Sequence, residues 1–199
     1  GTADTMEVLA KVAFPISRMK QIVLKTNGCI VWGGSLNLAP ADDKIIAVER
    51  PLEIDAESQL LASIMAKKYS VSSTHILIDI PIGNDAKVKN KIEALRLKKE
   101  FEKIGRKLGK RVKVIMTSGT QPIGNGIGPA LEARDVLWLL RRDSRRPLDL
   151  EKKCIYMASL ILEMAGIKNG YKKAVELLES GKASQKMTEI IKAQNGIIT

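Results

Sequence analysis

A hydroxyl, an ammonium group and a carboxylate stand close together in one short stretch of this sequence. Ser63 and Lys67 are four residues apart in a segment whose apolar residues repeat at helical spacing, so both side chains fall on one flank of the predicted helix. Asp55 stands just ahead of that helix. Such a set can bind a polar ligand, although Asp is also a common N-cap and Lys on a helix rim is usually solvated.

A second cationic residue, Lys87, belongs to the loop that follows a predicted strand. Residues 74–81 are almost continuously apolar, as expected of a strand that is buried on both faces. In open α/β sheets ligands bind at the carboxyl ends of the strands, and this rule places Lys87 on the functional edge of the sheet. The alternative is an exposed residue in the first turn of the helix predicted at 88–108.

The sequence pattern predicts an α/β fold with a mostly parallel central sheet, flanking helices and a helical C-terminal part. The second long strand is expected at 111–116, after the helix that connects it to the first. The other expected elements are helices at 1–10, 17–25, 130–142, 148–165, 170–180 and 183–194, a helix that follows Asp55 within the stretch 53–68, a short buried strand at 29–32 and a loop at 35–43. We expect residues 1–199 to form a single α/β domain.

A glycine-rich loop at 117–129 leads from the second long strand to the next helix. Its spacing does not match Gly-x-Gly-x-x-Gly, and no acidic residue follows at the end of a next strand, so the loop does not predict a dinucleotide site. The loop can still form part of a site wall. Gln121 and Asn125 are its candidate ligand contacts.

The composition argues against several classes of protein. Two cysteines among apolar neighbours, Cys29 and Cys154, cannot form a disulfide framework, which favours a reducing, cytoplasmic setting. His75 is the only histidine, so a His-rich metal site or a Ser-His-Asp triad has little support. No apolar run approaches the roughly 20 residues that cross a bilayer, and we expect neither a membrane span nor a signal peptide.

The net charge of +11 raises the alternative of a basic nucleic-acid-binding module. The lysines and arginines are scattered over predicted helices, however, and aromatic residues make up only 4% of the chain. Few side chains are therefore available for stacking on bases. We expect no nucleic-acid partner, and an anionic small substrate would account for part of the charge.

Several long motifs relate the chain to a known family. The helix Leu61-Ala-Ser-Ile-Met-Ala-Lys67-Lys68 resembles the Ala-Ser-Ile-Leu-Ser-Lys-Lys helix of the thymidine phosphorylase family. The stretches at 1–9, 30–43 and 121–132 are most similar to the archaeal AMP phosphorylase branch of that family. The resemblance implies that the chain is a central part of the catalytic α/β domain. It further implies that the family's upstream phosphate loops and its C-terminal domain lie outside the chain.

The same resemblance implies an activity and a set of site residues. AMP and phosphate would give adenine and ribose 1,5-bisphosphate, and other nucleoside 5′-monophosphates are possible substrates. By position, Asp55 is implied as the proton donor and Thr2 as a phosphate contact. Ser63, Lys67 and Lys87 are implied as substrate-binding residues. Phosphate would be a co-substrate, no cofactor or metal is expected, and the protein is expected to be a homo-oligomer.

The choice of base depends on one segment. Leu38-Ala-Pro-Ala-Asp42-Asp43 stands where the pyrimidine enzymes carry Tyr-x-x-Arg-Asp, whose Tyr and Arg grip the pyrimidine. The resemblance therefore implies a different base, consistent with adenine. The alternative is a thymidine or other pyrimidine nucleoside phosphorylase, which needs no 5′-phosphate on its substrate. Without the upstream phosphate loops, we expect the chain by itself to have little activity.

Proton donation by Asp55 requires a raised pKa. A free carboxyl group has a pKa of about 3.9, and the N-terminus of a helix lowers it further because the helix dipole stabilises the anion. Burial or a neighbouring carboxylate would have to outweigh that effect. The candidate neighbours are Glu53, Glu57 and the pair Asp42-Asp43.

Overall fold

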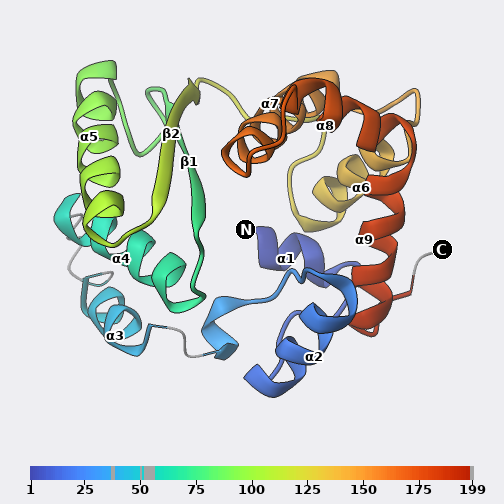
Figure 1. Cartoon of the computed structure of the whole chain (residues 1–199), viewed down its shortest axis with the longest axis horizontal. Helices are drawn as coiled ribbons and strands as arrows, with labels where there is room; N and C mark the ends of the chain where they lie inside the picture. Colours follow the sequence, from blue (N-terminus) through green and yellow to red (C-terminus); the bar gives the residue numbers. More distant parts are fainter. Residues whose placement is uncertain (37–38, 50, 52–56, 198–199) are drawn as a thin grey trace. The chain divides into compact units, whose positions relative to one another are not determined.

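The computed structural model describes residues 1–36, 39–49, 51 and 57–197, and they form two compact units. The first unit consists of Gly1–Leu36, Ile123–Leu162 and Lys168–Thr199, and the second of Asn37–Pro122 and Glu163–Ile167. Figure 1 shows the elements of both units in chain order.

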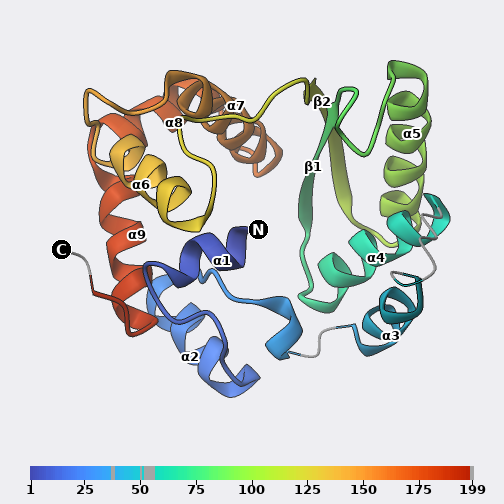
Figure 2. The same ribbon diagram turned by 180° about the vertical axis from the view of Figure 1, so that it is seen from behind.

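The second unit is built on two parallel strands. β1 (His75–Ile82) pairs with β2 (Arg111–Ser118) in a register that runs from His75 opposite Arg111 to Ile82 opposite Ser118. α5 (Lys91–Lys107) lies between the two strands in the sequence and runs alongside them (Figures 1 and 2). A parallel pair needs such a crossover connection, because the chain must return to the same end of the sheet.

One face of the sheet is buried under helices. Burial alternates along β1, so that Ile76, Ile78 and Ile80 enter the core. They pack in one hydrophobic cluster with Leu97 and Phe101 of α5 and with residues of α4 (Glu57–Ser70). The helix α3 (Pro40–Glu49) precedes α4 in the same unit. The sheet and α5 therefore give α4 a fixed surface on which to lie.

The ends of α5 are marked by local signals. The side chain of Asn90 caps the first turn by accepting a hydrogen bond of 2.9 Å from the backbone N–H of Glu93. Beyond the last turn, Gly109 has a φ of +65°, which favours glycine because other residues meet steric strain there. The Asn90 cap and Gly109 therefore define the two ends of α5 and set a length that spans the sheet.

The first unit is helical. Its elements are α1 (Thr2–Glu7), α2 (Ile16–Thr26), the short 3₁₀ helix η1 (Gly33–Leu36), α6 (Pro129–Leu140), α7 (Leu148–Met164) as far as Leu162, α8 (Gly170–Glu179) and α9 (Lys182–Ala193). The hydroxyl of Thr5 donates a hydrogen bond of 2.8 Å to the carboxylate of Glu132, which joins α1 to α6. Residues far apart in the sequence thus meet in this unit.

The predicted fold class is confirmed, because the structure combines a parallel sheet with flanking helices and a helical C-terminal part. Both long strands and the C-terminal helices lie where the sequence pattern predicts them. The expected single domain stays a prediction. None of the helices within the described residues is long and apolar enough to cross a membrane.

Two local predictions are wrong. Residues 29–32 form no strand: the backbone of Ile30 bonds to the side chain of Gln194, and the N–H of Trp32 donates to the carbonyl of Val12. These partners satisfy the polar backbone groups without a sheet. The loop expected at 35–43 contains the end of η1 and the start of α3. Pro40 opens α3, a position that proline tolerates because its missing N–H needs no partner there.

Candidate functional site

Three polar side chains form a stripe along α4. Gln59, Ser63 and Lys67 follow one another at intervals of four residues and therefore lie on one side of the helix. The neighbouring side of α4 is apolar, and its residues Leu61 and Met65 are buried in the core of the second unit. Packing of this apolar side fixes the rotation of the helix, and with it the direction of the polar stripe.

A carboxylate from another helix joins the polar stripe. Asp42, the third residue of α3, accepts hydrogen bonds of 2.9 Å from the hydroxyl of Ser63 and 3.2 Å from the amide of Gln59. The Nζ atom of Lys67 lies 2.8 Å from the Oδ2 atom of Asp42 and 3.3 Å from the Oγ atom of Ser63. We call Asp42, Gln59, Ser63 and Lys67 the polar cluster.

The carboxyl group of Asp42 is ionised at neutral pH. Its side chain is only 5% exposed, and this burial acts to raise its pKa. The hydrogen bonds from Lys67 and Ser63 and the positive charge of Lys67 outweigh that effect and hold the pKa of Asp42 below its ordinary value. Asp42 therefore acts as an acceptor in the polar cluster and has no proton to give.

Lys67 connects the polar cluster to solvent. Its side chain is 42% exposed, whereas its partner Asp42 is buried. A lysine ammonium group has three N–H donors, and Asp42 and Ser63 are its two acceptors among the described residues. The third donor can meet a ligand that has a carbonyl oxygen or a negative charge. The chemistry that this arrangement supports is the binding and stabilisation of an electron-rich group.

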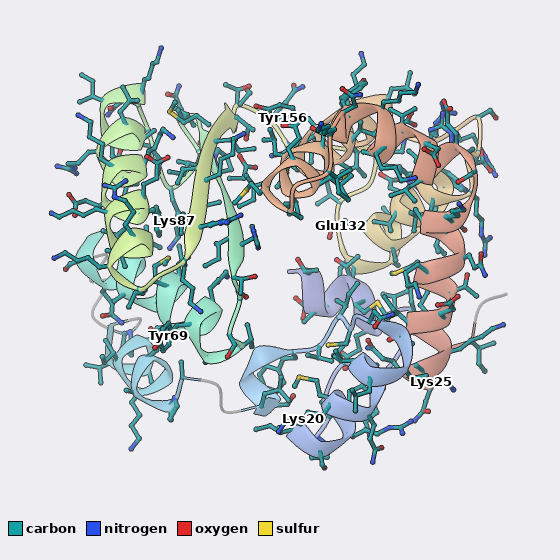
Figure 3. All side chains as sticks on the ribbon, in the orientation of Figure 1. Lys20, Lys25, Tyr69, Lys87, Glu132 and Tyr156 are labelled. Atoms are coloured by element: carbon teal, nitrogen blue, oxygen red, sulfur yellow. The ribbon has the colours of Figure 1, made fainter. Side chains whose placement is uncertain are left out.

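Lys87 lines a hollow at the carboxyl ends of the strands. The hollow has a volume of about 360 Å³, and its walls include Asp79 and Pro81 of β1 and Gly119 after β2. Leu60 and Ile64 of α4 also line it. The exposed Lys87 side chain, labelled in Figure 3, thus lies at the edge of the sheet where the general rule for α/β proteins locates ligands.

The loop that carries Lys87 is held by close backbone contacts. The N–H of Gly83 donates to the carbonyl of Val88, and the N–H of Gly119 donates over 2.8 Å to the carbonyl of Ile82. A Cβ atom on Gly83 would clash with the backbone carbonyl of Gly119, so the two strand-end loops require glycine at this contact. The position of Lys87 therefore depends on the loop after the neighbouring strand.

The structure brings some of the predicted site residues together. Ser63 and Lys67 are in contact, and Lys87 belongs to the same unit but lines the hollow on the adjacent side of α4. No hydrogen bond or ion pair joins Lys87 to either of them among the residues described. Thr2 is exposed in α1 of the first unit. Asp55, the implied proton donor, lies outside the described residues.

Sequence reasoning missed the roles of Asp42 and Gln59. Gln59 could have been found, since it stands one turn before Ser63 on the flank that already contained Lys67. Asp42 could not, because it reaches α4 from a separate helix. The sequence places Asp42 in the segment that replaces Tyr-x-x-Arg-Asp and among the candidate neighbours of Asp55, and in the structure it bonds to Ser63 and Lys67.

Residues 124–126 of the glycine-rich loop belong to the first unit and are held there by two carboxylates. The carboxylate of Asp135 on α6 accepts hydrogen bonds of 2.7 Å and 2.8 Å from the backbone N–H groups of Asn125 and Gly126. Asp149 accepts another from the N–H of Gly124. These donors are therefore occupied within the protein, and this part of the loop has a structural role.

Comparison with known proteins finds relatives that share one name. No family model matches the chain. A "Putative thymidine phosphorylase" of Bradyrhizobium diazoefficiens is 53% identical over 197 residues, which cover 98% of this chain and 38% of that protein. A protein of the same name from Nitrobacter hamburgensis is 51% identical over 198 residues, with 98% and 39% covered. "Putative thymidine phosphorylase 1" of an Acidovorax species is 48% identical over 200 residues, with 99% and 39% covered.

The fold and these relatives agree on the class of protein. A parallel sheet with flanking helices and a helical part is compatible with the catalytic domain of a nucleoside phosphorylase. Sequence identity of about one half over almost the whole chain supports the assignment of this chain to the thymidine/pyrimidine phosphorylase family. The chain spans 38% to 39% of the length of these relatives.

Proposed function

We propose that the protein is a pentosyltransferase that cleaves the glycosidic bond of a nucleoside with phosphate. The observation that carries this proposal is the identity of about one half with relatives named for thymidine phosphorolysis. The polar cluster supports it, because a hydroxyl and a solvent-accessible ammonium group stand on the helix that resembles the family's base-binding helix. Ser63 and Lys67 are the proposed contacts to the base.

The reaction places opposite charges on the two parts of the substrate. An oxygen atom of phosphate forms a bond to C1′ of the sugar while the bond from C1′ to the base nitrogen breaks, and its electron pair leaves with the base. Lys67 is proposed to stabilise the negative charge that develops on the departing base. Thr2 is the proposed phosphate contact, and Lys87 a proposed substrate contact.

A pyrimidine nucleoside such as thymidine is the proposed substrate. The names of the relatives favour thymidine. The absence of a Tyr-x-x-Arg-Asp motif at residues 38–43 had favoured adenine, yet relatives that are about half identical over nearly the whole chain have the thymidine name. That segment is therefore weaker evidence than the names.

AMP is the second candidate substrate, and it is favoured by the motifs around Asp55, Ser63 and Lys87. In this version the products are adenine and ribose 1,5-bisphosphate, and Asp55 donates a proton to the departing adenine. Asp55 would need a raised pKa for this step. The ionised Asp42, which is bonded to Lys67 and Ser63, is not the proposed proton donor.

A substrate panel on the full-length protein tests the proposal. Thymidine, uridine and AMP are incubated with and without phosphate, and the released base is measured by chromatography. We expect phosphate-dependent release of thymine or uracil. Release of adenine from AMP alone would select the second candidate. No phosphate-dependent release of any base would refute the phosphorylase proposal.

A further inference from the structure

We infer that Asp42 is a positioning residue for nucleobase binding, which fixes the directions in which Ser63 and Lys67 present their hydrogen-bonding groups. The inference rests on the proposed function, because it concerns the same two base contacts. Asp42 itself is 5% exposed and is not offered as a contact to the substrate. Its effect is transmitted through its hydrogen bond to Ser63 and its ion pair with Lys67.

The hydrogen-bond directions follow from the ionised state of Asp42. An ionised carboxylate is only an acceptor, so the hydroxyl hydrogen of Ser63 is committed to Asp42 over 2.9 Å. An ammonium group is only a donor, so the 3.3 Å contact between Lys67 and Ser63 uses one lone pair of the Ser63 oxygen. Ser63 then has one lone pair left for a ligand. Lys67 has one N–H left, because its other two face Asp42 and Ser63.

Asp42 also limits the freedom of Lys67. A lysine side chain loses considerable rotamer entropy when it is held in place, and a solvent-exposed ion pair contributes little to that ordering. This pair differs, because its carboxylate is buried and lies 2.8 Å from the ammonium group. Lys67 is thus held in position before the base arrives, which lowers the entropic cost of binding.

The alternative to positioning is a purely structural role of Asp42. Through Gln59, Ser63 and Lys67, Asp42 also ties α3 to α4, so its loss can destabilise the second unit without any effect on the direction of ligand groups. Asp42→Asn is the informative change. Asparagine has the same size and keeps an acceptor oxygen, but it loses the charge and adds N–H donors that can turn the hydroxyl of Ser63.

The experiment measures steady-state kinetics of the full-length protein with thymidine and phosphate. We expect Asp42→Asn to lower kcat/KM for thymidine by about 10- to 100-fold, the equivalent of one hydrogen bond to a charged group. The KM for phosphate and the melting temperature are expected to change little. Asp42→Glu restores the charge and should recover part of the activity. The matched control is Glu102→Gln, which breaks the Lys98–Glu102 ion pair on α5 of the same unit and should leave both substrates unaffected.

A double-mutant cycle with Lys67→Ala separates positioning from stability. If Asp42 acts through Lys67, Asp42→Asn should cause a much smaller further loss in the Lys67→Ala background than in the wild type. A structural effect would give additive losses, and additivity would overturn the inference. If the wild type is active but Asp42→Asn behaves like Glu102→Gln, the inference is overturned and the phosphorylase proposal stays intact. A wild type without phosphate-dependent base release would overturn both.

The inference remains testable if Asp42→Asn lowers the melting temperature strongly. The Asp42→Glu variant then takes its place, because it keeps the charge and moves it by one methylene group. A smaller loss of kcat/KM that is confined to thymidine would support positioning. Equal losses of kcat/KM for thymidine and for phosphate would contradict it, since phosphate is not expected to contact Ser63 or Lys67.

Discussion

The ammonium group of Lys67 lies 2.8 Å from the buried carboxylate of Asp42. The two residues come from the last turn of α4 and the first turn of α3, so the ion pair joins two helices at a point that solvent can reach. Lys67 is therefore neither a solvated rim charge nor a fully buried one. Its exposed N–H is available to a ligand while its position is set from within the protein.

Removal of the carboxylate should destabilise the second unit. Asp42→Ala leaves Ser63 and Gln59 without their acceptor, and we expect the free energy of unfolding to fall by about 1–3 kcal/mol. Urea denaturation of the full-length protein measures this loss. Glu189→Gln is a control, because it breaks an exposed pair with Lys186 on α9, and it should change the stability by less than about 1 kcal/mol. Equal losses in the two variants would show that the burial of Asp42 has no energetic effect.

The stabilisation that Asp135 gives to the glycine-rich loop should depend on pH. Burial acts to raise the pKa of Asp135, but hydrogen bonds from Asn125, Arg134 and Gly126, with the charge of Arg134, lower it below its ordinary value. A carboxyl group with a lowered pKa stabilises the folded state at pH values above its unfolded pKa of about 3.9. That stabilisation is lost as the pH falls through the lower pKa of the folded state.

Melting temperatures of the wild type and Asp135→Asn from pH 7 to pH 2.5 measure this dependence. We expect the variant to be less stable at pH 7, and the difference between the two proteins to shrink once the pH falls below about 4. A difference that stays constant over the whole range would contradict the assignment of the charge as the stabilising feature.

The contact between the two strand-end loops should not tolerate a methyl group. Gly83→Ala would place a Cβ atom against the backbone carbonyl of Gly119, and we expect a loss of about 1–3 kcal/mol in unfolding free energy. The same change should lower kcat/KM, because the loop carries Lys87. Gly33→Ala is the control, since a Cβ atom there meets nothing within 4 Å. Unchanged stability and kinetics in Gly83→Ala would show that the loops can separate freely.

Asp55→Asn tests the proton-donor proposal of the second candidate, with AMP as the substrate of the full-length protein. If Asp55 protonates the departing base, turnover should fall by about 100-fold or more, in the range of general acid catalysis, while substrate affinity changes little. Rapid-quench measurement of base release together with equilibrium binding separates the two effects. Unchanged turnover would remove Asp55 from the mechanism.

The sequence predicted the elements better than the polar cluster. Regular periodicity located α5, β1 and β2, because each has a buried face that repeats at the period of its structure. Residues 29–32 are apolar like a strand, yet their backbone groups pair with Gln194 and Val12, which no local pattern indicates.

The polar cluster shows the same limit. Ser63 and Lys67 could be paired from their spacing on one helix. Asp42 could not be added to them, because its position depends on how α3 packs against α4 and therefore on tertiary structure. Local spacing predicts which residues share an element, and it does not predict which elements meet.

Thymine release by the wild type and by Lys67→Ala, assayed side by side in the full-length protein with and without phosphate, tests the central claim most directly. The wild type should release thymine from thymidine only when phosphate is present, and Lys67→Ala should lower kcat/KM for thymidine by about 10-fold or more. Thymine release that is independent of phosphate, or a Lys67→Ala variant as active as the wild type, would contradict the claim that Lys67 binds the base in a phosphorolysis reaction.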